Sequence, residues 1–142
     1  KGENDRLINL KIKSALKAKL KIIFCIGETL SEKRKKKTKS ILSKQIKVGL
    51  DGIKDKSKIF IAYEPVWAIG TGLVPKSMDL LNTINFIKSK FIGKLPKVLY
   101  GGSVNPQNIK NLKEINNIDG FLIGGASQNA KKFIDIVKKT YT

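Results

Sequence analysis

Four short apolar runs recur along the chain, at residues Ile22–Ile26, Ile59–Tyr63, Lys97–Tyr100 and Phe121–Ile123. They are rich in β-branched and aromatic side chains, and each is followed at once by glycine or glutamate. Uninterrupted runs of this length are typical of parallel strands that are buried on both faces. We therefore expect four parallel strands.

The segments between these runs carry the spacing of amphipathic helices. Apolar residues recur at helical intervals in three sets, namely Ile8, Ile12 and Ala15; Leu80, Ile84 and Ile87; and Phe133, Ile136 and Val137. Alternation of helix and strand predicts an α/β fold with helical crossovers, and no Pro/Gly/Ser-rich linker divides it. Such a chain fits either a small open α/β sheet or half of an eight-stranded barrel, whose usual length is about 250 residues. The half barrel would leave apolar edge strands unpaired.

Composition excludes several kinds of chemistry. The chain has no histidine and only one cysteine, Cys25, so it holds no Ser-His-Asp triad, Cys-His dyad, His-ligated metal or internal disulfide. We expect no metal and no cofactor, and chemistry that relies on carboxylates, lysines, hydroxyls and backbone amides. A single cysteine, no secretory leader and no apolar run of about 18 residues predict a cytoplasmic protein without a membrane partner. The start at Lys1 instead of Met suggests a fragment or a trimmed chain.

The formal net charge is +18. Clustered lysines and arginines could bind nucleic acid. The lysines are nevertheless spread over nearly every expected helix, and no aromatic residues are interleaved with the basic runs. We therefore favour solvated helix faces over a nucleic-acid partner, and expect the charge to help attract an anionic substrate.

The tract Ala62–Gly72 offers a general base and a lid. Glu64 ends the second apolar run, and Pro65 holds it in an extended conformation at the mouth of the strand. The apolar neighbours Trp67 and Ile69 would desolvate this carboxylate and make it a better proton acceptor. A rim carboxylate paired with lysine is the alternative. The apolar loop leads to Gly70, which permits close approach of an anion, and it suits a lid that excludes water.

Two glycine-rich turns follow the last two runs, at residues 101–103 and 124–127. Each would present backbone N–H groups at a helix start, where anions bind. In barrels, a phosphate site follows the seventh and eighth strands. Near the first run, we expect Cys25 to be a buried, inert thiol and Glu28 to cap a helix or pair with lysine.

These segments resemble the C-terminal half of the triosephosphate isomerase family. The resemblance rests on CIGET (25–29), AYEPVWAIGTG (62–72), YGGSV (100–104) and GFLIGGAS (120–127), in the family's order. It implies that residues 1–142 are the C-terminal portion of a single (β/α)8 TIM barrel domain and contribute strands five to eight. It also implies interconversion of dihydroxyacetone phosphate and D-glyceraldehyde 3-phosphate in glycolysis and gluconeogenesis, by a cytoplasmic homodimer.

By the same resemblance, Glu64 is the catalytic base. The groups that bind the substrate phosphate are Gly70, Ser103, Gly124 and Gly125. The family's Asn and Lys after the first strand and its His after the fourth have no counterpart in this chain, so we expect the chain alone to be inactive. Gln128 stands where the family commonly has Leu. The alternatives are another phosphate-binding barrel and a basic nucleic-acid-binding module.

Overall fold

The structure is a computed structural model that describes residues 2–142. Its strands are β1 (Ile22–Ile26), β2 (Ile59–Tyr63), β3 (Val98–Tyr100) and β4 (Gly120–Phe121). All neighbouring strands are parallel, and their order in the sheet is β1-β2-β3-β4. The sequential order confirms the expected α/β topology and assigns all the loops that follow the strands to one edge of the sheet.

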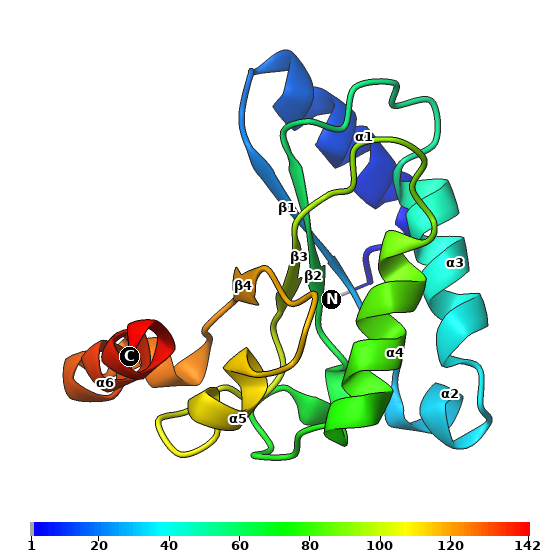
Figure 1. The fold of residues 1–142 in the computed structure, drawn as a ribbon. Coiled ribbons are helices and arrows are strands. Elements are labelled where there is room, and N and C mark those ends of the chain that lie inside the picture. The colour runs from blue at the N-terminus through cyan, green and yellow to red at the C-terminus, as the bar shows by residue number, and fades with distance from the viewer. Residues whose placement is uncertain (1) are drawn as a thin grey trace.

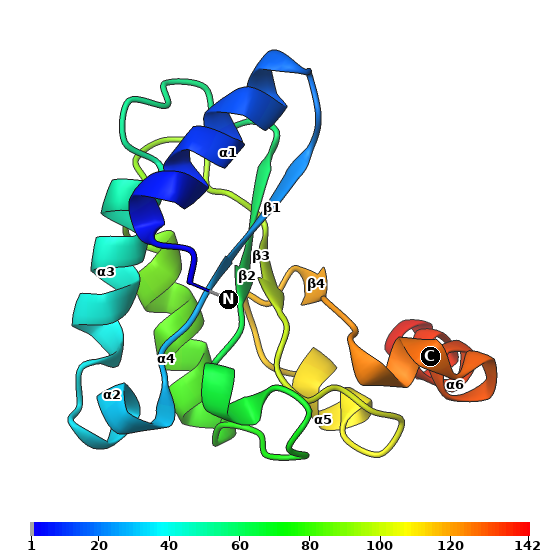
Figure 2. The same cartoon turned by 180° about the vertical axis from the view of Figure 1, so that it is seen from behind.

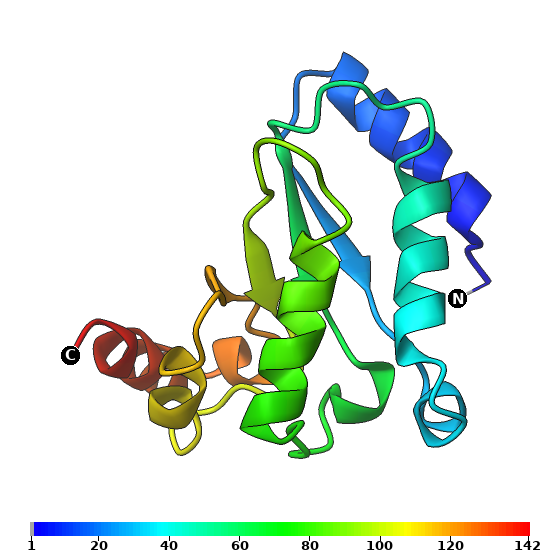
Figure 3. The same cartoon turned by 45° about the vertical axis from the view of Figure 1, so that its right-hand side comes forward.

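Helices connect the strands. The α-helices are α1 (Asp5–Lys17), α2 (Leu30–Arg34), α3 (Thr38–Gly49), α4 (Ser77–Lys88), α5 (Ile109–Lys113) and α6 (Ala130–Tyr141), and the 3₁₀ helices are η1 (Val66–Ala68) and η2 (Gly125–Gln128). Figures 1 and 3 show α1, α3 and α4 along one side of the strands, while α6 stands beyond β4. None of the helices in residues 2–142 combines the length and apolarity that a bilayer crossing requires.

One face of the sheet is packed, and the other is open at β1. Phe24, Ile61 and Val98 point to the packed face, where they join the core with the α4 residues Leu80, Ile84 and Ile87. On the other face Ile23 is 49% exposed and Cys25 is exposed as well. The prediction of strands buried on both faces is therefore wrong for β1. A sheet with sequential strand order and helices on one face is half of an eight-stranded barrel, because the open alternative carries helices on both faces.

The fourth strand is shorter than the run that predicted it. It pairs only through Gly120 and Phe121, opposite Leu99 and Tyr100 of β3. Leu122 adds one further bond, since its N–H donates to the carbonyl of Tyr100 at 2.9 Å. β4 is an edge strand next to a three-residue neighbour, so the ladder ends where β3 ends.

Helix α6 forms where the spacing predicted it, but its apolar face is only partly covered. Ile136 is buried, whereas Phe133 and Val137 are each 40% exposed. α6 lies at the open edge of the sheet, next to β4, and so has a neighbour on one side only (Figure 1).

Candidate functional site

Glu64 lies directly after β2 and is half-buried. Its N–H donates to the carbonyl of Ile26 at 2.8 Å, which continues the ladder by one residue and holds it at the strand mouth. This hydrogen bond agrees with the extended conformation that we expect before Pro65. The carboxylate therefore stands at the edge of the sheet where the connecting loops meet.

Two glycines form the seat of Glu64. A Cβ atom at Gly27 would overlap the Glu64 carbonyl oxygen, and one at Gly101 would lie 2.6 Å from Glu64 Cγ and 2.9 Å from Oε1. The sequence analysis placed Gly101 in an anion-binding turn, but it predicted no contact of Gly27 or Gly101 with Glu64. The signal was nevertheless present, because each follows an apolar run at the position that parallel register sets beside Glu64.

Cys25 lies beside Glu64, on the open face of the sheet. Partial desolvation, followed by the hydrogen bond and the negative charge of Glu64, raises the pKa of Cys25 to about 12. The thiol is consequently protonated at neutral pH, which agrees with an inert cysteine. The expectation that it is buried is wrong, since the residue is exposed, on the face of β1 that none of the helices in residues 2–142 covers.

Glu28 is buried beside the apolar tract that follows Pro65. It is 1% exposed, and it accepts hydrogen bonds from the Tyr63 hydroxyl at 3.2 Å and from Trp67 Nε1 at 3.0 Å. Burial, with the charge and hydrogen bond of Glu28, raises the pKa of Tyr63. The expectation that Glu28 caps a helix or pairs with lysine is wrong, because Thr29 caps α2 and the carboxylate turns inward.

The apolar tract after Pro65 is held at both ends. Trp67 lies between Glu28 and Lys33, whose Nζ is 3.3 Å from the centroid of the indole ring. Farther along, Ser103 Oγ donates to the carbonyl of Ala68 at 2.6 Å and accepts from Gly72 N at 2.9 Å. Residues 66–76, which we call the lid, are thus fixed to the turn after β3. Figure 2 shows the lid beside α5 at one end of the molecule.

Gly70 and Gly72 make the turn of the lid possible. Their φ angles are 69° and 79°, in the left-handed region that glycine adopts without strain. Gly70 is exposed, and no atom of residues 2–142 lies within 4 Å of the place where its Cβ would be. Its role in the turn therefore comes from its backbone and leaves room for a ligand.

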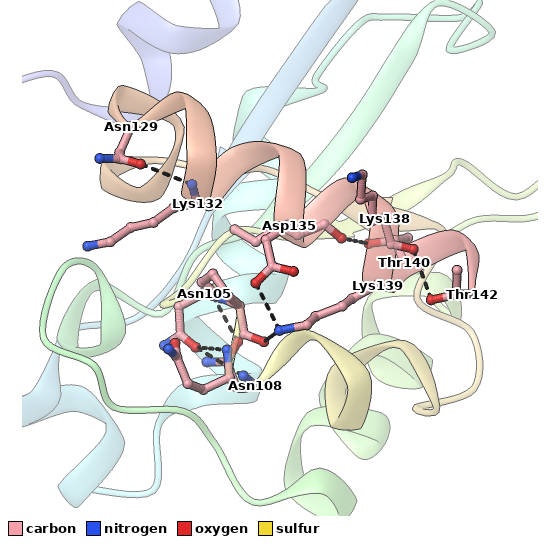
Figure 4. Close-up of polar contacts among 12 residues, drawn as sticks. Asn105, Asn108, Asn129, Lys132, Asp135, Lys138, Lys139, Thr140 and Thr142 are labelled. Carbon is pink, nitrogen blue, oxygen red and sulfur yellow. Dashed lines mark hydrogen bonds and ion pairs between the residues drawn. The ribbon is translucent and has the colours of Figure 1, made fainter.

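The turn after β3 differs from the expected helix start. Ser103 precedes α5 by six residues, and a network of asparagines bridges the gap. Asn108 Nδ2 donates to the carbonyl of Ser103 at 3.0 Å, and Asn108 Oδ1 accepts from Asn105 N at 2.9 Å. Lys139 of α6 donates to the carbonyl of Pro106 at 3.0 Å. Figure 4 shows Lys139 reaching toward the segment that contains Asn105 and Asn108. Asn108 thus orients Ser103, a role that the sequence did not reveal.

Tyr100 carries a buried hydroxyl without a hydrogen-bond partner among residues 2–142. Burial raises the pKa of this tyrosine. A Cβ atom at Gly102 would overlap the hydroxyl, so glycine is required next to it.

The second glycine turn begins a short helix. Gly124 is the N-cap of η2 and Gly125 its first residue, and both are exposed. The bond from Leu122 N to the Tyr100 carbonyl holds this turn beside the turn that contains Ser103. The sheet therefore brings four residues to the end where its strands finish, namely Glu64, Ser103, Gly124 and Gly125. The Ser103 hydroxyl connects the lid, which contains Gly70, to this end of the sheet.

Comparison with known proteins extends over nearly the whole chain. The family model described as triosephosphate isomerase matches residues 1–140. A triosephosphate isomerase of Thermodesulfovibrio yellowstonii is 46% identical over an alignment 142 residues long. The aligned part covers 96% of this chain and 58% of that protein. Those of Pelodictyon phaeoclathratiforme and Geobacter metallireducens are also 46% identical, over 96% of this chain and 57% and 58% of theirs. The chain thus spans somewhat more than half the length of these curated relatives.

Proposed function

The chain belongs to the triosephosphate isomerase family, and from this premise we propose that it is the C-terminal portion of a single (β/α)8 barrel enzyme. That enzyme would interconvert dihydroxyacetone phosphate and D-glyceraldehyde 3-phosphate by proton transfer through an enediolate. The observation that carries the proposal is the seat of Glu64 between Gly27 and Gly101, at the edge where the lid and both glycine turns meet.

Glu64 is the proposed base. A carboxylate at the mouth of a strand can take a proton from one carbon of a bound triose phosphate and return it to the neighbouring carbon. Its backbone is fixed by the bond to Ile26, and Gly101 leaves the space that its side chain occupies. The lid above it would exclude water while the enediolate exists, which limits loss of the intermediate.

Backbone amides are the groups that we propose to bind the substrate phosphate. Gly70 in the lid, Ser103 after β3, and Gly124 and Gly125 after β4 would each donate an N–H. The hydroxyl of Ser103 is already hydrogen-bonded to Ala68 and Gly72. Ser103 would therefore bind the phosphate through its main-chain N–H. This assignment needs no metal or organic cofactor.

The remaining catalytic groups would come from the part of the barrel that this chain does not contain. A positioned base is worth about 10²–10⁴ in rate, and loss of one electrophilic donor costs about 10²–10³. The chain has no histidine to polarise the substrate carbonyl. We therefore expect residues 1–142 alone to be inactive or nearly so, and full-enzyme rates from the purified chain would contradict this.

The wider context follows from the family. We place the whole enzyme in glycolysis and gluconeogenesis, in the cytoplasm and as a homodimer, with triose phosphate as its small-molecule partner. Nucleic acid is not needed to account for any residue of the site.

Complementation tests the proposal. The chain would be co-expressed with the N-terminal part of the Thermodesulfovibrio yellowstonii relative, and the co-purified complex assayed for isomerisation of glyceraldehyde 3-phosphate. We expect activity that a phosphorylated enediolate analogue inhibits. Glu64→Gln should lower kcat by about 10²–10⁴, whereas Glu114→Gln, which changes an exposed carboxylate on α5's end, should not. An inactive co-purified complex, or equal activity of the two variants, would refute the assignment.

A further inference from the structure

The end of the sheet opposite Glu64 carries a dense basic surface. It consists of the loops that precede β1, β2 and β3, residues 18–21, 50–58 and 89–97, which we call the basic rim. Because the strands are parallel, these loops lie at one end of the molecule, the upper end in Figures 1 and 3. The rim contains eight lysines and two aspartates; the lysines are Lys19, Lys21, Lys54, Lys56, Lys58, Lys90, Lys94 and Lys97.

The three loops contact one another. Lys58 Nζ donates to the carbonyl of Lys19 at 3.3 Å, which joins the first loop to the second. A hollow of about 600 Å³ lies between the second and third loops, with Lys54, Lys90 and Lys94 in its lining. The lysines therefore form one continuous surface with positive charge from three separate segments.

Aspartate does little to neutralise this surface. Asp55 accepts a hydrogen bond from Ser57 N at 2.8 Å. That bond first, and then the positive charges of Lys58 and Lys94, lower the pKa of Asp55. One carboxylate is thus shared between lysines of two loops, and most of the rim's positive charge remains open to solvent.

Aliphatic side chains project from the same loops. Leu20 is 57% exposed, Leu95 is 51% exposed, and Ile92 is fully exposed at 102% beside the left-handed turn at Gly93. Single exposed apolar residues are ordinary. Three at the tips of two loops, surrounded by lysines, make a surface that is both basic and apolar.

We propose that the basic rim is a peripheral binding surface for an anionic lipid bilayer. Lysines near a membrane are attracted to acidic headgroups, each strengthening binding by roughly fivefold. Aliphatic loop tips gain further by entering the boundary between headgroups and acyl chains. This proposal departs from the expectation of no membrane partner, which rested on the lack of a long apolar segment; surface binding requires no such segment.

The same features disfavour nucleic acid as the partner. The rim contains no arginine, the residue that pairs with phosphate and guanine in a bidentate manner. Its one aromatic residue, Phe91, is half-buried, so it offers no exposed platform for stacked bases. Ile92 and Leu95 would stay in water against a polyanion and would add nothing to its binding.

Vesicle co-sedimentation of the 142-residue chain tests the proposal. Vesicles of phosphatidylcholine, with and without phosphatidylserine, would be compared with polyuridylate as a soluble polyanion. We expect binding to the phosphatidylserine vesicles that weakens with salt. The triple variant Lys54→Gln, Lys94→Gln, Lys97→Gln should lose roughly a hundredfold in partitioning.

Two further variants separate charge from insertion. The control Lys35→Gln, Lys110→Gln, Lys131→Gln removes three exposed lysines from the other end of the molecule and should change binding by less than about twofold. Ile92→Ser with Leu95→Ser should weaken vesicle binding by roughly tenfold and leave polyuridylate binding unchanged. Circular dichroism would verify the fold of each variant.

Several results would overturn the proposal. Equal losses in the rim and control variants would mean that net charge alone acts. Vesicle binding that is unchanged by the Ile92 and Leu95 substitutions, together with equally tight polyuridylate binding, would mean a polyanion surface. Loss only after Phe133→Ser would move the contact to the exposed apolar residues of α6.

Discussion

The thiol of Cys25 reports directly on its proximity to Glu64. It is the chain's single cysteine, and it is exposed to reagents. Partial desolvation, and then the hydrogen bond and charge of Glu64, raise its pKa from 9.0 to about 12. Because the thiolate is the reactive form, we expect iodoacetamide to modify Cys25 slowly despite its exposure, and Glu64→Gln to accelerate the reaction.

The pKa shift sets the size of the effect. At pH 8 the thiolate fraction falls from about one in ten to about one in ten thousand, a loss of roughly a thousandfold. A more basic thiolate is more nucleophilic, with a Brønsted coefficient of about 0.4–0.5, and this restores roughly twentyfold. The native chain should thus react roughly fiftyfold more slowly than an unperturbed cysteine. Desolvation, the largest cause, persists in Glu64→Gln, so that variant should recover only part of the rate.

The assay compares alkylation rates followed by mass spectrometry. The same chain unfolded in urea supplies the reference rate for Cys25, and Glu114→Gln supplies a variant with one carboxylate fewer elsewhere. A native rate equal to the unfolded rate would refute the raised pKa. Equal rates for Glu64→Gln and Glu114→Gln would show that the Glu64 carboxylate does not act on the thiol.

Four other substitutions probe separate parts of the site. Tyr63→Phe removes a hydrogen bond to a buried carboxylate and should lower the free energy of unfolding in urea by about 2 kcal/mol. Tyr100→Phe removes an unpaired hydroxyl and should be neutral or raise that free energy by up to about 1 kcal/mol. The opposite order of the two variants would contradict the hydrogen-bond assignment. Both tyrosines have a raised pKa in the folded chain. Stability should therefore be fully retained below about pH 10 and should decline above it, as the tyrosines of the unfolded chain ionise. Tyr100→Phe should make that decline shallower. Asn108→Ala frees the carbonyl of Ser103 and should increase acrylamide quenching of Trp67, the chain's one tryptophan. Unchanged quenching would exclude a link between Asn108 and the lid. Gly101→Ala should displace the Glu64 side chain and lower kcat of the complemented enzyme by about 10² with little change in KM, and wild-type kcat would argue against the glycine seat.

The strand pattern was readable because it depends on local chemistry. A short apolar run followed by glycine or glutamate marked β1 and β2 with the bounds that the structure has. The spacing of Leu80, Ile84 and Ile87 identified the buried face of α4, where all three are fully buried. Pro65 determined that Glu64 stays extended after its strand, since proline restricts the residue before it. These features need only neighbours in sequence.

Other features depend on segments that meet only in the folded chain. Glu28 lies 35 residues from Tyr63 and 39 from Trp67, and no local pattern indicates that its carboxylate turns inward to both. The same holds for Ser103, whose hydroxyl joins the lid across 31 and 35 residues. Cys25 is exposed because none of the helices described in residues 2–142 covers its face of β1. β4 is two residues long because its neighbour β3 ends at Tyr100. The order of residues along the chain places Glu64 and the two glycine turns directly after their strands. Tertiary packing settles which side chains touch Glu64, because hydrogen bonds and steric exclusion between distant segments depend on the register of the strands that hold them.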